Sequence, residues 1–271
     1  MPANDTSKDI PFNEPEEPKA IPMIVALFDV LGFSNRIQHD GLAAVQKLYD
    51  DLIQKAVFSD GMVCIGVHPF GDGTVCPAVF TFQVGFAYFS DTILLWSPLQ
   101  DLYPGPFLQR CANLMCEALH VGVPMRGAVA LGEAVMHRRT STYLGTPLVE
   151  AARLEAAQDW VGFTLGPSAL WPDFMAELNP NQIIEYDPPM KPGYEDYLSC
   201  VCLDWPRVWR EKHGHCPSST LRGLISDPKY SKYYEHAITF CEHSERSQDW
   251  HKNPIPNARL RMGPRPSAPV A

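Results

Sequence analysis

Hydrophobic positions between residues 23 and 203 change repeatedly from a strand pattern to a helical pattern. Residues 23–30 (MIVALFDV) form a continuous apolar run rich in β-formers, and a Leu-Gly-Phe-Ser turn ends it. Such a run is typical of a strand that is buried on both faces. Leucines, a valine and an isoleucine then recur at helical spacing over residues 41–58, which predicts an amphipathic helix. The fold therefore begins as a strand followed by a helix.

The rest of this region mixes hairpins with strand–helix units. Gly71 and Gly73 separate two apolar stretches, and Ser90 and Asp91 interrupt the second stretch before it resumes. Strands are predicted at residues 62–68, 78–89, 92–96, 125–131, 162–165, 183–186 and 198–203, and helices at 107–121, 147–158, 167–178 and 230–244. This order predicts an α+β sandwich in which helices pack on a mostly antiparallel sheet.

Composition divides the chain into four parts. Residues 1–22 are acidic and rich in proline, and residues 253–271 contain five prolines, so we predict a disordered leader and a disordered tail. Residues 23–204 are expected to form one catalytic-type domain. The periodicity weakens after about residue 205, and we assign residues 205–252 to a C-terminal appendage.

Charge and hydropathy exclude several classes of partner. The chain has 271 residues, of which 22 are basic and 31 acidic, and its formal charge of −9 disfavours binding to nucleic acid. The longest apolar runs are far shorter than the roughly 20 residues that span a bilayer, so we expect no membrane insertion. The N-terminus does not resemble a signal peptide. Eight cysteines without zinc-site spacing then favour reduced thiols in the cytoplasm.

Two acids stand in apolar strands, where a carboxylate is costly without a partner. Asp29 ends the first strand and Asp91 lies at a strand-to-strand corner. If the strands are neighbours, both carboxylates reach one edge of the sheet and favour Mg²⁺ or Mn²⁺ holding a triphosphate. The N–H groups of the turn at residues 30–34 suit phosphate oxygens. The alternative is that Asp29 caps a helix and Asp91 is a plain turn residue.

Four segments, in chain order, resemble the catalytic domain of class III nucleotide cyclases. They are FDVLGFS at 28–34, YFSD at 88–91, RGAVALGE at 126–133 and GTPLVEAARLE at 145–155. Ser90 stands where the family has glycine. Together they span about residues 23–203, and the resemblance implies the ferredoxin-like sandwich of these cyclases.

The resemblance also implies roles for single residues. Asp29, Asp91 and the Val30 carbonyl would bind two Mn²⁺ or Mg²⁺ ions per site. The ribose 3′-oxygen would attack the α-phosphate, with pyrophosphate leaving. Arg153 matches the family's transition-state arginine. The neighbouring residues expected around the nucleotide are Phe28, Val30, Leu31, Gly32 and Phe33.

Two arginines and one valine leave alternatives open. Arg153 is otherwise a surface residue that pairs with one of two acids, Glu150 or Glu155. The strand arginine Arg126, for which a catalytic role is expected, needs an anion and would contact substrate or Glu133. Val149 replaces the helical asparagine with which the family orients the ribose, which raises the alternative of a degenerate, nucleotide-binding sensor.

The base-reading positions depart from those of purine cyclases. Ala87 replaces a lysine, and Thr142 replaces an aspartate or cysteine, while Tyr49 lies within reach of the pocket. The short motifs look like the Pycsar-type bacterial pyrimidine cyclases of antiphage defence. We therefore expect UTP to be converted to cyclic UMP, with cytidylate or purine cyclase activity as the alternative. The resemblance further implies a head-to-tail homodimer with sites at its interface, and an effector protein that senses the product.

Overall fold

The computed structural model describes residues 16–58, 63–69, 75–81, 84–99, 104–176, 178–194, 201–225 and 230–247, with the backbone alone over 63–69 and 75–81. The predicted tail, and most of the predicted leader, lie outside these residues. The strands are β1 Ile21–Val30, β2 Val63–Pro69, β3 Val75–Thr81, β4 Gly85–Phe89, β5 Thr92–Pro98, β6 Met125–His137, β7 Thr142–Gly145, β8 Phe163–Leu165, β9 Ile183–Glu185 and β10 Val201–Leu203.

Helices follow five of the ten strands that the structure describes. They are α1 Phe33–Asp40, α2 Leu42–Ile53, the π-helix η1 Gln54–Phe58, α3 Pro104–His120, α4 Thr146–Ala157, the 3₁₀-helix η3 Pro167–Leu170, α5 Pro172–Ala176, α6 Trp205–His213, α7 Ser218–Gly223 and α8 Ser231–Arg246. None of the helices in the described part of the chain combines the length and the apolarity that a bilayer crossing needs.

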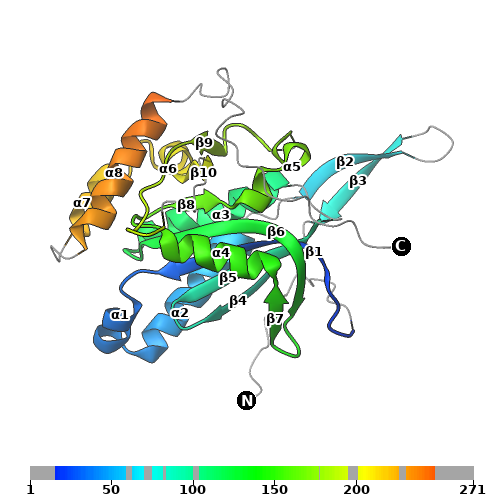
Figure 1. Ribbon diagram of the computed structural model, residues 1–271, viewed down its shortest axis with the longest axis horizontal. Coiled ribbons are helices and arrows are strands. Elements are labelled where there is room, and N and C mark those ends of the chain that lie inside the picture. The colour runs from blue at the N-terminus through cyan, green and yellow to red at the C-terminus, as the bar shows by residue number, and fades with distance from the viewer. Residues whose placement is uncertain are drawn as a thin grey trace, which may run out of the picture.

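One eight-stranded sheet organises the molecule (Figure 1). Its order is β4-β5-β1-β6-β8-β10-β9, with β7 paired to β6, and every pair except β6 with β8 is antiparallel. The predicted α+β class with a mostly antiparallel sheet is confirmed. Strands β2 and β3 form a separate two-stranded ribbon.

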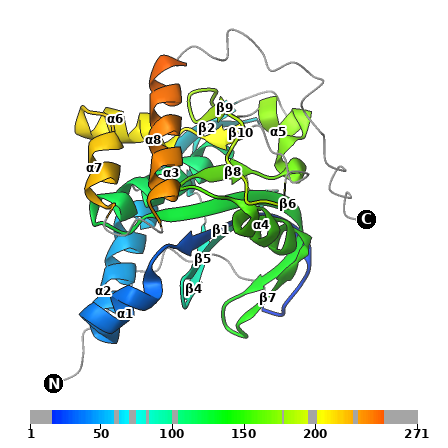
Figure 2. The same cartoon turned by 60° about the vertical axis from the view of Figure 1, so that its left-hand side comes forward.

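Strand β1 lies inside the sheet and buries both of its faces, as its continuous apolar run predicts. Residues Ile24, Ala26 and Phe28 join the larger core, which includes residues of α2 and α3. Met23 and Val25 alternate with them and join a smaller core, which α4 covers. Figure 2 shows α4 across one face of the sheet, with α3 behind the other.

The last three helices belong to the larger core. Trp205 and Trp209 of α6, Leu221 of α7 and Phe240 of α8 are each at most 2% exposed and share that core with the sheet. Helices α6 and α7 are absent from the sequence prediction, because α6 has a short apolar stripe and α7 is only six residues long. The strand predicted at 78–89 is two strands, β3 and β4.

Candidate functional site

The two acids expected to act together lie at neighbouring positions of the sheet. Asp29 pairs in register with Thr92, the first residue of β5, and the Val30 N–H donates to the Asp91 carbonyl at 2.8 Å. Asp91 lies in the turn between β4 and β5, directly after Ser90, whose φ is 54°. Both side chains line one cavity of about 490 Å³. We call it the acidic cavity.

Residues from several distant parts of the chain line the acidic cavity together with the two acids. It consists of Asp29, Val30, Leu31, Gly32, Phe33, Ser34, Asn35, Asp91, Arg126, Lys191, Leu224, Tyr230, Tyr233 and Tyr234. A volume of this size lies within the range of small-molecule sites. The cavity therefore has room for a ligand next to the two carboxylates.

Asp29 has a positively charged neighbour, Arg126, and a negatively charged neighbour, Asp91. Burial raises the pKa of its carboxyl above the ordinary value, Arg126 acts in the opposite direction, and the negative charge of Asp91 raises it again. Two like charges that share a cavity favour a cation between them. A divalent ion between Asp29 and Asp91 would relieve the repulsion between their negative charges.

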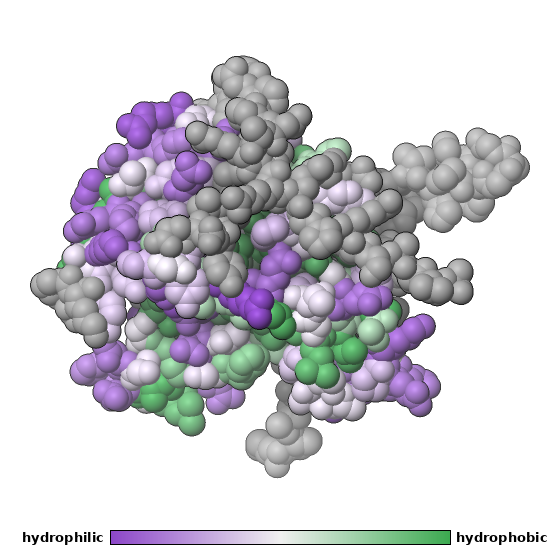
Figure 3. Space-filling model, viewed as in Figure 1, coloured by the Kyte–Doolittle hydropathy of each residue, from purple (hydrophilic) through white to green (hydrophobic). Residues whose placement is uncertain are grey.

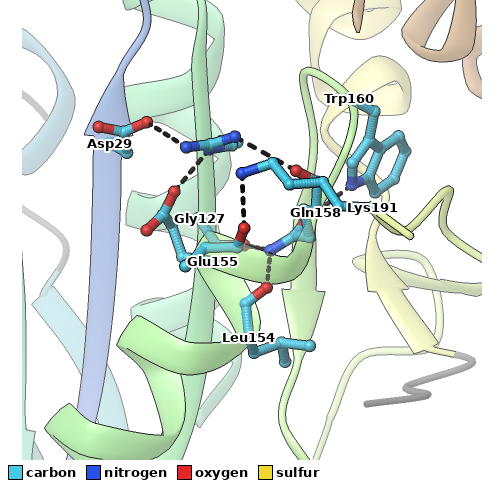
Figure 4. Close-up of polar contacts among 9 residues, drawn as sticks. Asp29, Gly127, Leu154, Glu155, Gln158, Trp160 and Lys191 are labelled. Atoms are coloured by element: carbon cyan, nitrogen blue, oxygen red, sulfur yellow. Dashed lines mark hydrogen bonds and ion pairs between the residues drawn. The ribbon is translucent and has the colours of Figure 1, made fainter. Parts of the chain in front are cut away.

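Arg126 is the centre of a polar network that Figure 4 shows. Its guanidinium bonds to Asp29 Oδ2 at 2.9 Å, to Glu155 Oε1 at 2.5 Å and to the Gln158 carbonyl at 3.2 Å. The pairing of Arg126 with Glu133, one of two partners expected from the sequence, is wrong. Glu133 is exposed, whereas cross-strand pairing of Asp29 with Arg126 places these two side chains together.

The turn after β1 supplies backbone donors to the same cavity. Gly32 has a φ of 77° and precedes α1, whose first N–H with an intrahelical partner is that of Arg36. The earlier N–H groups of the helix, from Phe33 to Asn35, have no intrahelical acceptor and suit an anion. Gly32, not Asp29, is the N-cap of α1, so the alternative of a helix-capping aspartate is wrong.

The donor set fits Mg²⁺ or Mn²⁺ bound partly through substrate. Among the described residues no group of three His, Cys, Asp or Glu side chains forms a metal cage, so Asp29 and Asp91 are two carboxylates without a third. Mg²⁺ is usually held by one or two carboxylates, with waters and phosphate oxygens completing its shell. Val30 lines the cavity beside them.

Sequence reasoning missed the wall of the acidic cavity opposite the turn. It is made by Lys191, in the segment between β9 and β10, and by Leu224, Tyr230, Tyr233 and Tyr234 around α8. Lys191 Nζ donates to the Ala156 carbonyl at 2.6 Å. These residues are remote in sequence from every motif, and only their tertiary placement connects them with the acids.

Other predicted nucleotide contacts lie behind the cavity or away from it. Phe28 is fully buried, with its ring 4.9 Å from that of Phe163. Tyr49 is 2% exposed and packs between the rings of Phe33 and Tyr88, at 6.0 and 5.5 Å. Burial, then the negative charges of the two acids, raises the pKa of Tyr49, and its buried hydroxyl has no hydrogen-bond partner.

Helix α4 presents its candidate residues on two different sides. Glu155 reaches Arg126, whereas Val149 and Arg153 line a separate hollow with Gly145 and Ser168. Val149 and Arg153 are four residues apart and share a face, while Glu155 is about 200° around the helix from Arg153. Arg153 therefore faces away from the acidic cavity of its own chain.

Neither acid suggested for Arg153 forms an ion pair with it in the part of the chain that the structure describes. Glu155 binds Arg126, and the Glu150 carboxylate accepts from the backbone and the hydroxyl of Ser168, both at 2.9 Å. The sequence alternative of a surface ion pair within α4 is therefore wrong, and Arg153 is exposed.

Thr142, which the sequence predicts to contact the base, lines an adjoining hollow together with apolar side chains. Phe89, Leu144 and Val149 line it and are 53%, 64% and 51% exposed. Ala87 packs against the smaller core on the same side of the sheet. Figure 3 shows hydrophobic surface gathered over β7 and the adjoining end of α4. Exposed apolar patches of this kind mark sites of association.

No protein-family model and no curated protein matches this chain. Among solved structures, it is similar to the crystal structure of the guanylyl cyclase Cya2, with a TM-score of 0.39 and 10% sequence identity. The alignment covers 69% of this chain and 92% of that protein.

Proposed function

We propose that the protein is a nucleotide cyclase, which converts UTP to 3′,5′-cyclic UMP and pyrophosphate at the acidic cavity. The supporting observation is that Asp29 of β1 and Asp91 of the β4–β5 turn line one cavity, together with a turn whose N–H groups have no intrahelical acceptor. In the reaction the ribose 3′-oxygen bonds to the α-phosphorus, the bond to the β-phosphate oxygen breaks, and the hydroxyl proton is lost.

Asp29 and Asp91 are the groups that would hold Mg²⁺ or Mn²⁺, two ions per site, with the Val30 carbonyl beside them. Such ions lower the pKa of a bound hydroxyl and neutralise phosphate charge. The chain itself orients the Asp29 carboxylate, because Arg126 binds one of its oxygens and leaves the other available. The turn at Gly32 to Asn35 directs N–H groups to the phosphates.

Arg153 completes this site in a second copy of the chain. It faces away from its own acidic cavity, and its charge is suited to the α-phosphate, where negative charge develops in the transition state. A head-to-tail homodimer brings Arg153 of one protomer to Asp29 and Asp91 of the other and forms two equivalent sites. The exposed apolar hollow of Phe89, Leu144 and Val149 supplies the surface that such a dimer buries.

The base would lie in the hollow that contains Thr142. Purine recognition of the usual cyclase kind needs a lysine and an acid or thiol, and this chain has Ala87 and Thr142 at those positions. A threonine hydroxyl donates or accepts, which suits the edge of uracil. We infer that UTP is the substrate and that cyclic UMP is a second messenger of bacterial antiphage defence, read by an effector protein.

A second candidate is a nucleotide-binding sensor without turnover. It is favoured by Val149, whose exposed side chain carries no polar group for the ribose at the position of the family's asparagine. The two acids beside the turn at Gly32 to Asn35 favour the enzyme instead, because a sensor does not need metal ions to activate the ribose 3′-oxygen.

One incubation separates these functions. The purified protein is mixed with each of the four ribonucleoside triphosphates and Mn²⁺, and the products are resolved by mass spectrometry. Cyclic UMP is the expected product. Cyclic CMP or a cyclic purine nucleotide would contradict the choice of base, and the absence of every cyclic product, with nucleotide bound, would support the sensor.

The Asp91→Ala variant tests the residue that carries the proposal. We expect turnover to be abolished while the dimer persists, because Asp91 lies in a turn and does not itself line the apolar hollow. Size-exclusion chromatography with light scattering reports the dimer. Activity near that of the wild type would remove Asp91 from the site.

A further inference from the structure

The C-terminal helix α8 contributes directly to the acidic cavity. Tyr230 precedes α8, and Tyr233 and Tyr234 lie in its first turn; all three line the cavity with Leu224, which follows α7. The rings of Tyr230 and Tyr233 are 6.3 Å apart. A segment with no part in the cyclase-like motifs therefore forms one wall of the candidate site.

The start of α8 is held against the loop between α4 and β8. The His236 ring lies 2.7 Å from the Asp159 carbonyl, Lys232 forms an ion pair with the Asp159 carboxylate, and the Val161 N–H donates to the Tyr233 carbonyl at 3.3 Å. Phe240 packs edge-on against Trp160, with ring centroids 4.8 Å apart. These contacts fix the position of Tyr233.

The same segment of chain also holds Arg126. Gln158, just before Asp159, accepts a hydrogen bond from Arg126 through its carbonyl, and its side chain donates to the Gly127 carbonyl at 2.8 Å. The Trp160 indole N–H donates to the Gln158 side chain at 2.7 Å. Tyr233 and Arg126 are therefore positioned by one short stretch, and both line the acidic cavity.

The chemistry of this wall suits an anion. Two cationic side chains, Arg126 and Lys191, line the cavity with the tyrosines, and the N–H groups after Gly32 lie in the same lining. Phenol hydroxyls donate hydrogen bonds to phosphate oxygens, and bonds to a charged acceptor are the stronger class. The hollow assigned to the base lies elsewhere, with Thr142, which leaves this wall for the other end of the nucleotide.

We propose that Tyr233 donates a hydrogen bond to the terminal phosphates of the bound triphosphate, so that α8 is part of the phosphate site. The inference deepens the proposed function and rests on it for the identity of the natural ligand. It assigns to the C-terminal helices a role in distinguishing a triphosphate from shorter phosphates.

Binding of inorganic tripolyphosphate tests the contact without base or turnover. Isothermal titration calorimetry with the full chain and Mg²⁺ compares the wild type with Tyr233→Phe, which removes only the hydroxyl and keeps the ring. We expect about tenfold weaker binding of tripolyphosphate, and about equal binding of orthophosphate. The matched control is Tyr194→Phe, since Tyr194 does not line the cavity and its variant should bind as the wild type does.

The outcomes separate this inference from the proposed cyclase activity. Tripolyphosphate affinity of Tyr233→Phe within twofold of the wild type overturns the inference, and so does a wild type that binds no tripolyphosphate. If the wild type cyclises UTP and Tyr233→Phe has an unchanged KM, the inference fails while the proposed function stands. If no nucleotide is cyclised and the tenfold loss is still found, the proposed function fails and the inference stands.

Discussion

Arg126 shows how one side chain balances the charge of a whole site. It separates Asp29 from Glu155, and both of these carboxyls are largely buried, with 19% and 11% of the side chain exposed. Burial raises the pKa of each carboxyl, and Arg126 lowers it. Without the arginine, two carboxylates would face one another without a cation, which is costly.

Arg126→Met should therefore destabilise the protein by about 2–4 kcal/mol, because both carboxyls lose their partner. Urea unfolding followed by circular dichroism measures this loss. The double variant Arg126→Met/Glu155→Met is the control, and it should recover part of the stability because one of the unpaired acids is gone. Equal stability of Arg126→Met and the wild type would contradict the account.

The thiol of Cys216 is more acidic than an ordinary cysteine. A hydrogen bond from Cys241, followed by one from Ser218 at 3.0 Å, lowers the pKa of Cys216 to about 5, whereas burial raises the pKa of Cys241. A thiol with this pKa is a thiolate at neutral pH, and the thiolate is the reactive form.

Alkylation of Cys216 by iodoacetamide should accelerate from pH 4 to about pH 6 and then level off, because the thiolate forms as pH rises through its pKa. Peptide mass spectrometry follows each cysteine separately. Buried Cys111 should react far more slowly, because burial raises its pKa. In Cys241→Ala the rise should move to higher pH; an unchanged profile would show that Cys241 is not the donor.

At the scale of elements, the β4–β5 hairpin shows why one turn residue matters. Ser90 adopts a φ of 54°, the left-handed region that side chains other than glycine rarely enter. This turn conformation reverses the chain after β4 so that β5 can pair with β1. It also places Asp91 at the acidic cavity. Serine at this position therefore holds a strained backbone next to the candidate metal site.

Ser90→Gly should stabilise the protein by about 0.5–1 kcal/mol, because glycine removes the left-handed penalty but loses more entropy on folding. Thermal unfolding measures the gain. As a control, Ser231→Gly in the first turn of α8 should lose about 0.5–1 kcal/mol. A lower unfolding temperature for Ser90→Gly would show that the serine side chain contributes more than its backbone costs.

At the scale of the whole molecule, α4 places Glu155 and Arg153 on different sides of the helix. Glu155 binds Arg126 at the acidic cavity of its own chain, whereas Arg153 lines a hollow on another side of the helix. A reaction that needs Asp91 and Arg153 together therefore needs two chains.

Mixing two inactive variants should restore activity. Asp91→Asn and Arg153→Ala are each expected to lose about 10²–10³-fold in turnover. After subunit exchange, half of the dimers are mixed and carry one intact site of two, so about a quarter of wild-type activity should return. Cyclic UMP formation measures it. The control mixture, Asp91→Asn with Asp29→Asn, has both lesions in one half-site and should stay inactive; restoration there would contradict the shared site.

Much of the fold follows from the sequence alone. The continuous run of β1 and the helical repeats of α2, α3 and α4 are local patterns, and a local pattern is decided by which face each residue must bury. The α+β class and the position of Asp91 at a corner follow from the order of these patterns. The sequence also singled out Asp29, Asp91 and Arg153 as candidates.

Only the tertiary structure decided how these parts combine. That Arg126 binds Asp29 and Glu155 instead of Glu133 depends on strand register and on the docking of α4, which no local pattern encodes. Tyr233 and Lys191 lie at the acidic cavity because segments that are distant in the sequence from Asp29 and Asp91 fold back to it. Contacts of this kind arise from the packing of complete elements, and for that reason the sequence determined the candidates while the fold determined their neighbours.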